Sequence, residues 1–496
     1  MRTLSVMSRR LSMSLILALV GSGCVGVTVS APTGPAIASG ASAYIATARE
    51  SAFLDTLSHR TFDFFWETTN PRNGLTPDRW PTKSFSSVAA VGFALTAYPI
   101  GVEHGWVTRD AARERVLTTL RFFWTAPEGP DGTGVTGYKG FFYHFLDMET
   151  GRRFATVELS TIDTALLLAG ALTCRQYFDR DDAGEREVRA LADSIYRRVD
   201  WSWARDNETL VRMGWHPEPA SQQNARGFIP SQWTGYDEGM ILYVLALGSP
   251  THPIDPAAWT QWTKTYKWDR FQGQDFVQFA PLFGHQYSHL WVDFRGIQDE
   301  YMRGRTIDYF ENSRRATLSH RAYATANPAQ WRGYGPDAWG LTASDGPLDS
   351  MFVIDARSRT FHTYWARGVG RDEMNDDGTL VPTAAGGSVP FAPEIAIPAL
   401  VAMRERYGEP LFGRYGFVDA FNPTVQTPGP ALHHGRIVPG LSWFDTDYLG
   451  IDQGPIIGMV ENWRSGFVWK LIRRDPDVVR GLCRAGFTGG WIAGRC

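Results

Sequence analysis

The strongest constraint on the fold is an alternation between helices that are apolar on every side and helices that keep one polar face. Segments 160–178 and 236–247 carry apolar residues at almost every position. Helices of this kind are buried on all sides in a folded protein. Segments 109–124 and 183–199 instead place Arg, Asp and Glu along one face, which is typical of helices at a surface. The pattern predicts two sets of helices, one enclosed by the other.

Helical periodicity recurs from one end of the chain to the other, with few convincing strands between the helices. About six buried helices ringed by about six amphipathic ones predict an all-α fold, the (α/α)6 barrel, built as a single large domain. If the two sets alternate in direction, the inner helices run parallel and their N-termini open at one end. The predicted helices cover residues 43–68, 86–98, 109–124, 160–178, 183–199, 236–247, 256–266, 285–294, 301–327, 393–407, 455–465 and 476–484.

Residues 1–24 are typical of a secretory signal. Basic residues precede the mostly apolar stretch 11–20, which is too short to cross a bilayer because a spanning helix needs roughly 20 residues. The segment before Cys24 is similar to a lipobox, the motif whose cysteine is acylated after cleavage, although Gly21 stands where Leu is usual. We therefore expect export and lipid attachment at Cys24. Plain cleavage further along the chain is the alternative.

Residues 25–43 are rich in Gly, Ser, Ala and Thr and carry no charge, which predicts a flexible linker. The folded domain is then expected over residues 44–496. Export with acylation would make the chain a periplasmic or outer-membrane-anchored lipoprotein that touches a membrane only through its lipid. We expect a monomer.

The composition disfavours a nucleic acid as a partner and favours a sugar. The net charge is -3 and Lys and Arg are scattered, so no basic stripe is present for a nucleic acid. Aromatic residues make up 13% of the chain, with 19 Trp, and aromatic planes pack well on the apolar faces of sugar rings. In loop 339–346, Trp339 would stack on such a ring and Asp345 would bind a hydroxyl; a simple turn is the alternative.

The cysteines predict one disulfide and no metal site. Cys483 and Cys496 flank the glycine-rich C-terminus, and an exported protein permits a bridge between them. Cys174 lies in an apolar helical segment and is predicted to be a buried free thiol. The chain also lacks a Gly-x-Ser-x-Gly elbow, a His-Glu-x-x-His motif and a phosphate-binding loop. We expect neither a metal nor a cofactor.

Glu238 lies at the junction into the apolar segment 236–247. Acid-catalysed cleavage of a sugar bond needs a protonated carboxyl, and apolar or aromatic neighbours raise a carboxyl pKa toward about 6 to 7. Trp233 and Tyr236 would supply such neighbours and contact the sugar. Alternatively, Asp237 and Glu238 only complement the helix dipole, which stabilises the anion and opposes the acid role.

Asp452 precedes another predicted buried helix, 455–465, and Pro455 suits the first turn of that helix. Asp452 is therefore the candidate for a second carboxylate that activates water. Its alternative role is an N-terminal cap. Glu461 is the second candidate for this base, although an ion pair with Arg464, three residues later, would also explain it.

Two further groups contain acids with competing explanations. Ser160 and Asp163 have the spacing of a capping box, yet Asp163 would also face the other acids if the inner helices are parallel. Trp291, Asp293 and Arg295 form the second group. A buried Asp–Arg ion pair accounts for this group, and binding of sugar hydroxyls is the functional alternative.

Several blocks of the chain, in this order, resemble the bacterial glucoamylase-like family, which includes the endo-β-1,2-glucanases of glycoside hydrolase family 144 and a domain of the cyclic β-1,2-glucan synthases. The resemblance covers nearly all of residues 43–487. The blocks that carry it are 64–66, 236–240 with 245–253, 288–296, 339–347, 382–394, 415–422 and 450–469.

The resemblance implies an (α/α)6 barrel and a metal-independent, inverting hydrolysis of β-1,2-glucan to short sophoro-oligosaccharides, with Glu238 and Asp452 as the acidic pair. An inverting pair is expected about 6.5 to 9.5 Å apart, unless a substrate hydroxyl relays the proton. Endo or exo action, the linkage and the identity of the base or relay stay open. The alternatives are a hydrolase or transglycosylase for another glucan linkage, and a non-catalytic glucan-binding lipoprotein.

Overall fold

The structure is a computed structural model that describes residues 44–218, 227–426 and 431–496. The predicted signal segment with Cys24 and the linker 25–43 lie outside these residues. Within them the helices are α1 Ala48–Thr68, α2 Val88–Glu103, α3 Arg109–Thr125, α4 Thr161–Tyr177, α5 Ala183–Arg198, α6 Met240–Gly248, α7 Ala257–Thr263, α8 Tyr287–Trp291, α9 Glu300–Arg305, α10 Tyr309–Ala326, α11 Pro382–Gly386, α12 Pro393–Tyr407, α13 Gly450–Ser465, α14 Phe467–Ile472 and α15 Pro476–Arg484.

The all-α prediction is incomplete, because short strands lie between the helices. Most have two residues, too few to leave an alternating pattern in the sequence. One sheet has five strands, β3 Gly137–Tyr138, β4 Phe141–Tyr143, β6 Leu159–Ser160, β7 Gly214–His216 and β8 Gly227–Phe228. Two pairs lead into buried helices and so matter for the site. They are β1 Arg79–Trp80 with β22 Tyr448–Leu449, and β2 Ser86–Ser87 with β5 Phe145–Leu146.

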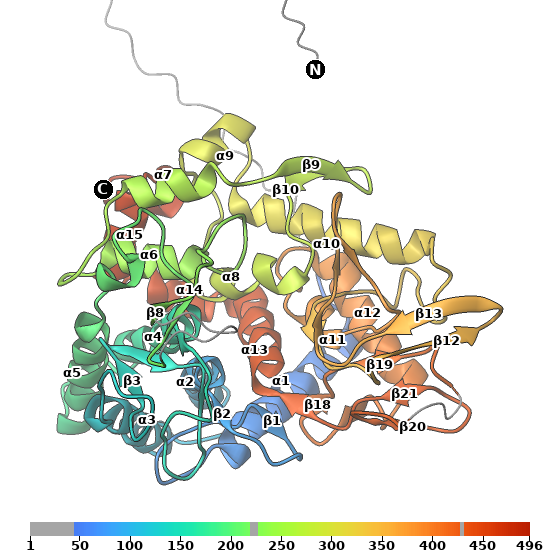
Figure 1. The fold of residues 1–496 in the computed structure, drawn as a ribbon, viewed down its shortest axis with the longest axis horizontal. Helices are drawn as coiled ribbons and strands as arrows, with labels where there is room; N and C mark the ends of the chain where they lie inside the picture. Colours follow the sequence, from blue (N-terminus) through green and yellow to red (C-terminus); the bar gives the residue numbers. More distant parts are fainter. Residues whose placement is uncertain (1–43, 219–226, 427–430) are drawn as a thin grey trace, which may run out of the picture. The chain divides into compact units, whose positions relative to one another are not determined.

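The remaining strands form hairpins, the pair β11–β14, and one three-stranded sheet, β19-β21-β20. The longest of them, β12 and β13, form a hairpin whose strands are labelled in Figure 1. Their bounds are β9 Trp268–Phe271, β10 Gln274–Val277, β11 Ala343–Ser344, β12 Ser350–Ile354, β13 Arg357–Phe361, β14 Trp365–Ala366, β15 Gly368–Val369, β16 Met374–Asn375, β17 Phe412–Gly413, β18 Gly416–Phe417, β19 Phe421–Asn422, β20 Arg436–Ile437 and β21 Trp443–Phe444.

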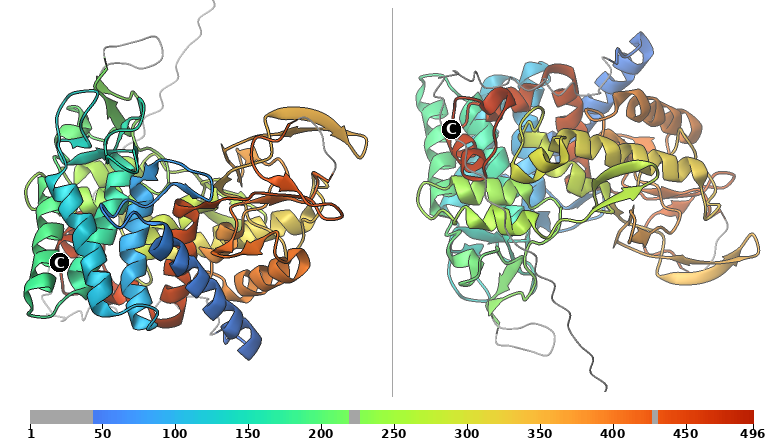
Figure 2. Two further views of the ribbon diagram at one scale, coloured as in Figure 1. Left: turned by 90° about the horizontal axis from the view of Figure 1, so that it is seen from below. Right: turned by 90° about the horizontal axis from the view of Figure 1, so that it is seen from above.

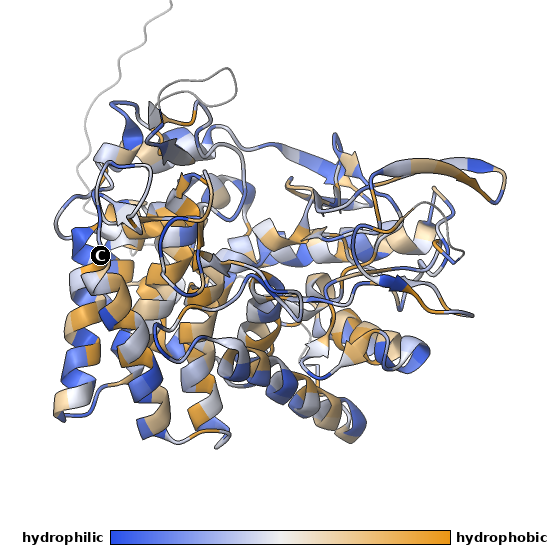
Figure 3. Ribbon diagram, turned by 60° about the horizontal axis from the view of Figure 1, so that its bottom comes forward, coloured by the Kyte–Doolittle hydropathy of each residue, from blue (hydrophilic) through white to orange (hydrophobic). Residues whose placement is uncertain are grey.

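The expected alternation of buried and surface helices is confirmed. Every residue of α6 is buried, and nearly every residue of α2, α4 and α13. Helices α3 and α5 bury only one face. Figure 3 shows this contrast, with hydrophobic ribbon on the enclosed helices and hydrophilic stretches on the outer ones.

Close backbone contact between glycines holds two of the buried helices together. A Cβ atom on Gly170 of α4 would lie 2.1 Å from the carbonyl oxygen of Gly92 in α2. Helices α2, α4 and α5 pack in sequence, with α3 against α5, and Figure 2 shows this row of helices side by side. On its other side α2 packs against α13, which also contacts α11 (Figure 1).

Most predicted helices are present, but some ends differ. The predicted segment 301–327 is two helices, because Thr306 takes a left-handed conformation, with φ +59°, at the end of α9. The side chain of Asp308 then caps α10. Helix α13 begins at Gly450, so Pro455 lies inside it rather than in its first turn. The short helices α11 and α14 were not predicted.

The C-terminal cysteines are joined as predicted: Cys483 and Cys496 form a disulfide with a Cα–Cα distance of 5.3 Å. Cys174 is a buried free thiol. Over the part of the chain that the structure describes, no helix is both long enough and apolar enough to span a bilayer.

Candidate functional site

Four buried helices bring ionisable side chains together at their N-terminal ends. Asp163 is in the first turn of α4, Glu238 directly precedes α6, Tyr287 begins α8 and Asp452 is in the first turn of α13. Besides burial, the charges of Asp452 and Glu238 raise the pKa of the Tyr287 hydroxyl. The charge of Asp163 likewise adds to the effect of burial on the pKa of Glu238. We call Glu238, Asp163, Asp452 and their acidic neighbours the acidic site.

Glu238 has the environment of a general acid. Glu238 lies before α6 and not inside it, because a turn precedes the helix. In this turn the Gly239 N–H donates a hydrogen bond to the Asp237 carboxylate at 2.9 Å. Burial, together with the nearby charge of Asp163, raises the pKa of Glu238 to about 7. A substantial fraction of this carboxyl is therefore protonated at neutral pH, which an acid catalyst requires.

Asp163 serves both roles proposed for it. Its backbone N–H donates to the Ser160 hydroxyl at 3.2 Å, which caps α4, and its carboxylate is hydrogen bonded to the same hydroxyl. The other carboxylate oxygen lies 3.5 Å from Nε2 of His144, whose Nδ1 lies 2.7 Å from Glu158. Burial alone would lower the pKa of His144, but Asp163 and Glu158 outweigh it and raise it to about 9. A protonated His144 thus compensates part of the acidic charge.

Asp452 is 3% exposed and is fixed through its backbone, whose carbonyl accepts the Thr383 hydroxyl at 2.7 Å. Burial raises the pKa of Asp452 to about 7, and the charge of Asp345 adds to this effect. The neighbouring Asp419 carboxyl acts in the opposite direction and lowers the pKa of Asp452. Asp452 is therefore close to half ionised at neutral pH, as a base that must both accept and release a proton should be.

A cluster of three buried carboxylates adjoins Asp452. One oxygen each of Asp345, Asp419 and Asp445 lies within 4.8 Å of the others, and Arg79 donates to Asp345 at 2.6 Å. This spacing would admit a cation, but a guanidinium already contacts one of the three. Protonation can neutralise the rest, because burial and mutual repulsion raise the pKa values of Asp419 and Asp445 well above the usual range. We therefore assign no metal here.

Asp345 reaches the acidic site, but several other predicted substrate contacts do not. The rings of Trp291 and Trp339 are completely buried, and Nε1 of Trp291 donates to Thr96 at 3.0 Å. Trp233 and Tyr236 are 5% and 2% exposed. Trp339 therefore has no exposed face on which a sugar could stack, and Trp291 has none for a sugar contact. The sugar contacts of Trp233 and Tyr236 stay predictions.

The alternative explanation is correct for Asp293 and Arg295. They form an ion pair of 2.7 Å, Arg473 also pairs with Asp293, and Arg295 stacks on Trp469 at 4.1 Å. The partners come from the C-terminal helix α14 and the residue that follows it. These contacts account for both residues without a sugar, and the sugar-binding role stays an untested prediction.

Glu461 also lies outside the acidic site. It is nine residues beyond Asp452 in α13, about 13 Å along the helix axis, and it accepts a hydrogen bond from His104 at 2.8 Å. The predicted pair with Arg464 is wrong, because Arg464 pairs with Asp55 of α1 at 2.6 Å. Glu461 is thus held in a structural contact far from Asp452.

Several residues of the site were missed in the sequence. Tyr364 is 53% exposed. Burial of its hydroxyl and the nearby charges of Asp452 and Asp419 raise the pKa of that hydroxyl. Trp80 is 39% exposed and pairs in β1 with Tyr448, shortly before Asp452. Tyr364 is therefore an accessible aromatic side chain beside the acids, and Trp80 is an exposed ring next to Arg79, which donates to Asp345. Asp419 lies in block 415–422, which carried the family resemblance, and that block was the available signal.

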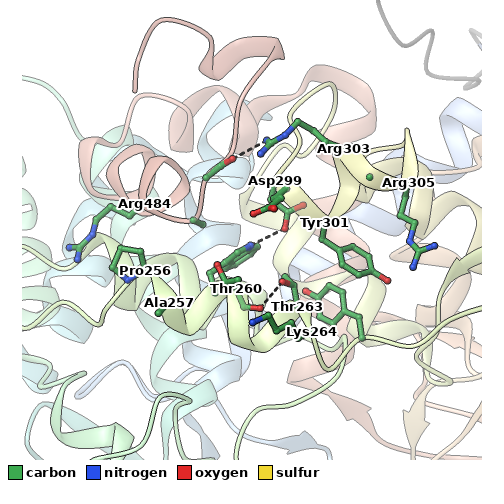
Figure 4. Close-up of a pocket in the computed structure, with 16 residues that line it drawn as sticks. Pro256, Ala257, Thr260, Thr263, Lys264, Asp299, Tyr301, Arg303, Arg305 and Arg484 are labelled. Carbon is green, nitrogen blue, oxygen red and sulfur yellow. Dashed lines mark hydrogen bonds between the residues drawn. The ribbon is translucent and has the colours of Figure 1, made fainter. Parts of the chain in front are cut away.

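A surface pocket of about 740 Å³ lies elsewhere, between α7, α9 and the end of α15. Figure 4 shows its basic rim, which includes Arg303, Arg305 and Arg484. Asp299 at its base is already bonded to Nε1 of Trp259 and to the hydroxyl of Tyr309, both at 2.8 Å. This acid is occupied structurally, and the pocket contains neither Glu238 nor Asp452.

Buried helices that present paired carboxylates at their N-terminal ends define a helix-rich protein with an acid–base site. The family model described as "Putative glucoamylase" matches residues 230–476, and a Bacteroides uniformis structure with the same description is 31% identical. That match covers 90% of this chain and 100% of the other, with a TM-score of 0.75. The chain belongs to this glucoamylase-like family.

Two similar proteins have more specific names. The structure of an endo-β-1,2-glucanase from Chitinophaga pinensis, in complex with sophorotriose and glucose, is 29% identical, with a TM-score of 0.74, and the match covers 89% of this chain and 99% of the other. An exo-β-1,2-glucooligosaccharide sophorohydrolase (non-reducing end) from Parabacteroides distasonis is 28% identical over 87% of this chain. The chain spans 57% of the length of that relative.

Proposed function

We propose that the protein is a glycoside hydrolase that cleaves β-1,2-glucan to short sophoro-oligosaccharides. The observation that carries this proposal is the pair Glu238 and Asp452, two carboxyls whose pKa values are both raised to about 7 beside one tyrosine. The names of the Chitinophaga and Parabacteroides relatives support the β-1,2 linkage. They do not agree on endo or exo action.

In this mechanism Glu238 donates its proton to the leaving glycosidic oxygen. Asp452 accepts a proton from the water that attacks the anomeric carbon from the opposite face, so the configuration inverts. A substrate hydroxyl can relay this second proton if water does not reach Asp452 directly. Trp80 and Tyr364 would bind the sugar rings through their exposed faces, and Asp345 would accept a hydroxyl.

We also propose that the helices form an (α/α)6 barrel. Three observations support this barrel. Helices α2, α4, α6 and α13 are enclosed, and α3 and α5 are buried on one side only. The N-terminal ends of α4, α6, α8 and α13 also converge. Short strands such as the β12–β13 hairpin would then extend from the barrel and set the number of sugar subsites. This arrangement would explain how similar proteins differ between endo and exo action.

The decisive experiment incubates the purified protein with linear β-1,2-glucan, laminarin and soluble starch and follows the products by chromatography. Sophoro-oligosaccharides from β-1,2-glucan alone are expected. Glu238→Gln should abolish turnover and keep glucan binding, because the amide has nearly the same shape and no acidic proton. Release of products from starch or laminarin only would show that the enzyme cleaves a different linkage. Binding without turnover by the wild-type protein would identify a non-catalytic glucan-binding protein.

We further propose that the protein is exported and anchored by a lipid on Cys24, on the basis of the N-terminal pattern alone. Metabolic labelling with a fatty acid analogue should label the full chain and not a Cys24→Ala variant. Equal labelling of both chains, or none, would contradict acylation at this position. Fractionation of the labelled cells would then report the compartment.

A further inference from the structure

Three phenylalanines pack ring against ring near the surface. The ring of Phe85 lies between the other two, with centroid distances of 4.1 Å to Phe145 and 4.7 Å to Phe154. Phe154 is 38% exposed, and Phe85 and Phe145 are half-buried. None of the three is among the described residues that form the hydrophobic core or pack on it. We call these rings, together with His144, whose ring stacks on Phe145 at 3.9 Å, the aromatic row.

One end of the aromatic row contacts α4 at the acidic site. Nε2 of His144 lies 3.5 Å from the Asp163 carboxylate in the first turn of α4. The hydroxyl of Thr161, the first residue of this helix, accepts a hydrogen bond from Nε1 of Trp233 at 3.0 Å. That bond joins the start of α4 to the segment that leads to Glu238. The row therefore begins beside the proposed acid.

The middle of the aromatic row is joined to the helix that carries the proposed base. The N–H of Asp78 donates to the carbonyl of Phe85 at 2.8 Å, and the N–H of Gly450 donates to the carbonyl of Asp78, also at 2.8 Å. Gly450 is the first residue of α13, which contains Asp452 in its first turn. Strand β2, directly after Phe85, pairs with β5, which contains Phe145. Backbone hydrogen bonds thus hold the row next to both helices of the proposed reaction.

The chemistry of the aromatic row suits a chain of sugar rings. Sugar rings present apolar C–H faces, which pack on aromatic planes. Phe154 packs against Phe85 on one side only and leaves part of its ring open to solvent. At the other end, the Glu158 carboxylate bonds to His144 at 2.7 Å and its side chain is 29% exposed. This carboxylate can accept a sugar hydroxyl.

The size of the aromatic row also favours a glucan over a protein partner. A stable protein interface buries roughly 800 Å² on each partner. Three partly exposed phenylalanine side chains present much less, because even complete burial of such a ring covers only about 150 to 250 Å². A single sugar chain, in contrast, needs only a narrow line of contacts.

We propose that the aromatic row is a glucan subsite that extends the acidic site outward and favours long chains. The inference rests on the proposed function. One sugar unit stacks on Phe154, and the chain continues along the row to the acidic site. The row binds the chain, and bond cleavage stays with Glu238 and Asp452. Because a stacked unit adds binding free energy, chains long enough to reach Phe154 are favoured over shorter ones.

Substitutions at Phe154 test the subsite through the effect of chain length on the kinetics. Phe154→Ala removes the outer ring, so the KM for long β-1,2-glucan should rise about threefold to tenfold. The effect should be on KM rather than kcat, because the ring does not touch the reacting atoms, and it should be smaller for the shortest oligosaccharide that is cleaved. Phe154→Tyr keeps the aromatic plane and should restore the wild-type KM. Trp124→Ala, which truncates a 41% exposed ring on the outer helix α3, is the matched control.

An unchanged KM for long glucan in Phe154→Ala would overturn the proposal. An equal rise of KM for long and short chains would overturn it as well, because it would indicate a general distortion of the site. A dimer of the wild-type protein that Phe154→Ala converts to a monomer, measured by light scattering, would assign the row to contact with a second copy instead.

Direct binding separates this subsite from the proposed function. Calorimetric titration with linear β-1,2-glucan should give a dissociation constant for Glu238→Gln that the additional Phe154→Ala raises by a similar factor. If the wild-type protein cleaves this glucan and the added substitution leaves the dissociation constant unchanged, the subsite is rejected and the proposed function stays. If the wild-type protein does not cleave the glucan and Phe154→Ala weakens its binding, the subsite stays and the proposed function is rejected. A wild-type protein that does not bind the glucan rejects both.

Discussion

At the scale of single residues, Glu238 and Asp452 carry out opposite tasks with similar proton affinities. Burial raises both pKa values to about 7, yet the proposed reaction needs a proton on Glu238 and none on Asp452. The active form is therefore the one in which Glu238 is protonated and Asp452 is ionised.

This predicts a bell-shaped pH dependence of kcat/KM with its maximum near neutral pH. Activity should fall at low pH because Asp452 becomes protonated, and at high pH because Glu238 loses its proton. Initial rates on β-1,2-glucan over about pH 5 to 9 would measure both limbs. A rate that keeps rising with pH across this range would show that Glu238 is not the acid.

The cluster of Asp345, Asp419 and Asp445 leads to a second prediction. Because Arg79 and bound protons compensate these carboxylates, dialysis against EDTA should leave kcat and the melting temperature unchanged. Recovery of lost activity on addition of Ca²⁺ or Mg²⁺, in a protein inactivated by the chelator, would instead identify a cation in this cluster.

The sequence placed four acids of the site, three of them through one physical argument. Asp163, Glu238 and Asp452 were found because each lies at the start of a buried helix, and Asp345 because it lies in a loop with a tryptophan. Tyr287 and Asp419 were not identified as site residues, since neither a lone tyrosine nor a lone aspartate in a loop has a recognisable sequence pattern. The buried tryptophans were misassigned for the related reason that composition does not distinguish a core ring from an exposed one.

At the scale of elements, close packing of α2 on α4 holds the acidic site together. Gly92 and Gly170 allow the two backbones to touch, and α4 carries Asp163 at its N-terminal end. Nearly complete burial made both helices predictable. Their glycines gave no sequence signal for this contact, because the partner helix is distant in the chain.

Gly170→Ala should therefore destabilise the protein strongly. The new Cβ would lie 2.1 Å from the Gly92 carbonyl, and overpacking of a core typically costs about 1 to 3 kcal/mol. Calorimetric melting would measure the loss. Gly304→Ala in α9 is the matched control, because nothing lies within 4 Å of the added atom and alanine favours a helix. Equal melting temperatures for the two variants would contradict the close contact.

At the scale of the whole molecule, buried histidines tie stability to pH. His285 and His320 are buried without charge, and burial lowers their pKa values to about 4 and about 3. The unfolded chain takes up protons on these residues below about pH 6.5, whereas the folded protein does not. Their contribution to stability is therefore lost as the pH falls from about 6.5 toward the folded-state values. The raised carboxyls of the acidic site act in the opposite direction.

Comparison of His320→Gln with the wild-type protein isolates the histidine contribution, since the carboxyls are common to both. The free energy of unfolding of the wild-type protein, relative to the variant, should decrease by up to about 1.4 kcal/mol per pH unit below pH 6.5. Urea unfolding at several pH values would measure it. His252→Gln, with a side chain 47% exposed, should show no such trend, and a pH-independent difference for His320→Gln would contradict the prediction.

The sequence alone determined the helical class, the buried helices, the C-terminal disulfide and the main acids, because each depends on residues close together in the chain. Tertiary structure decided which acids meet. It gathered Asp419 with Asp345 and Asp445, placed Glu461 with His104 instead, and buried Trp291 and Trp339 in the core. These outcomes depend on contacts between segments far apart in the chain, where burial and the charges of neighbours, and not local periodicity, set the proton affinity of each carboxyl.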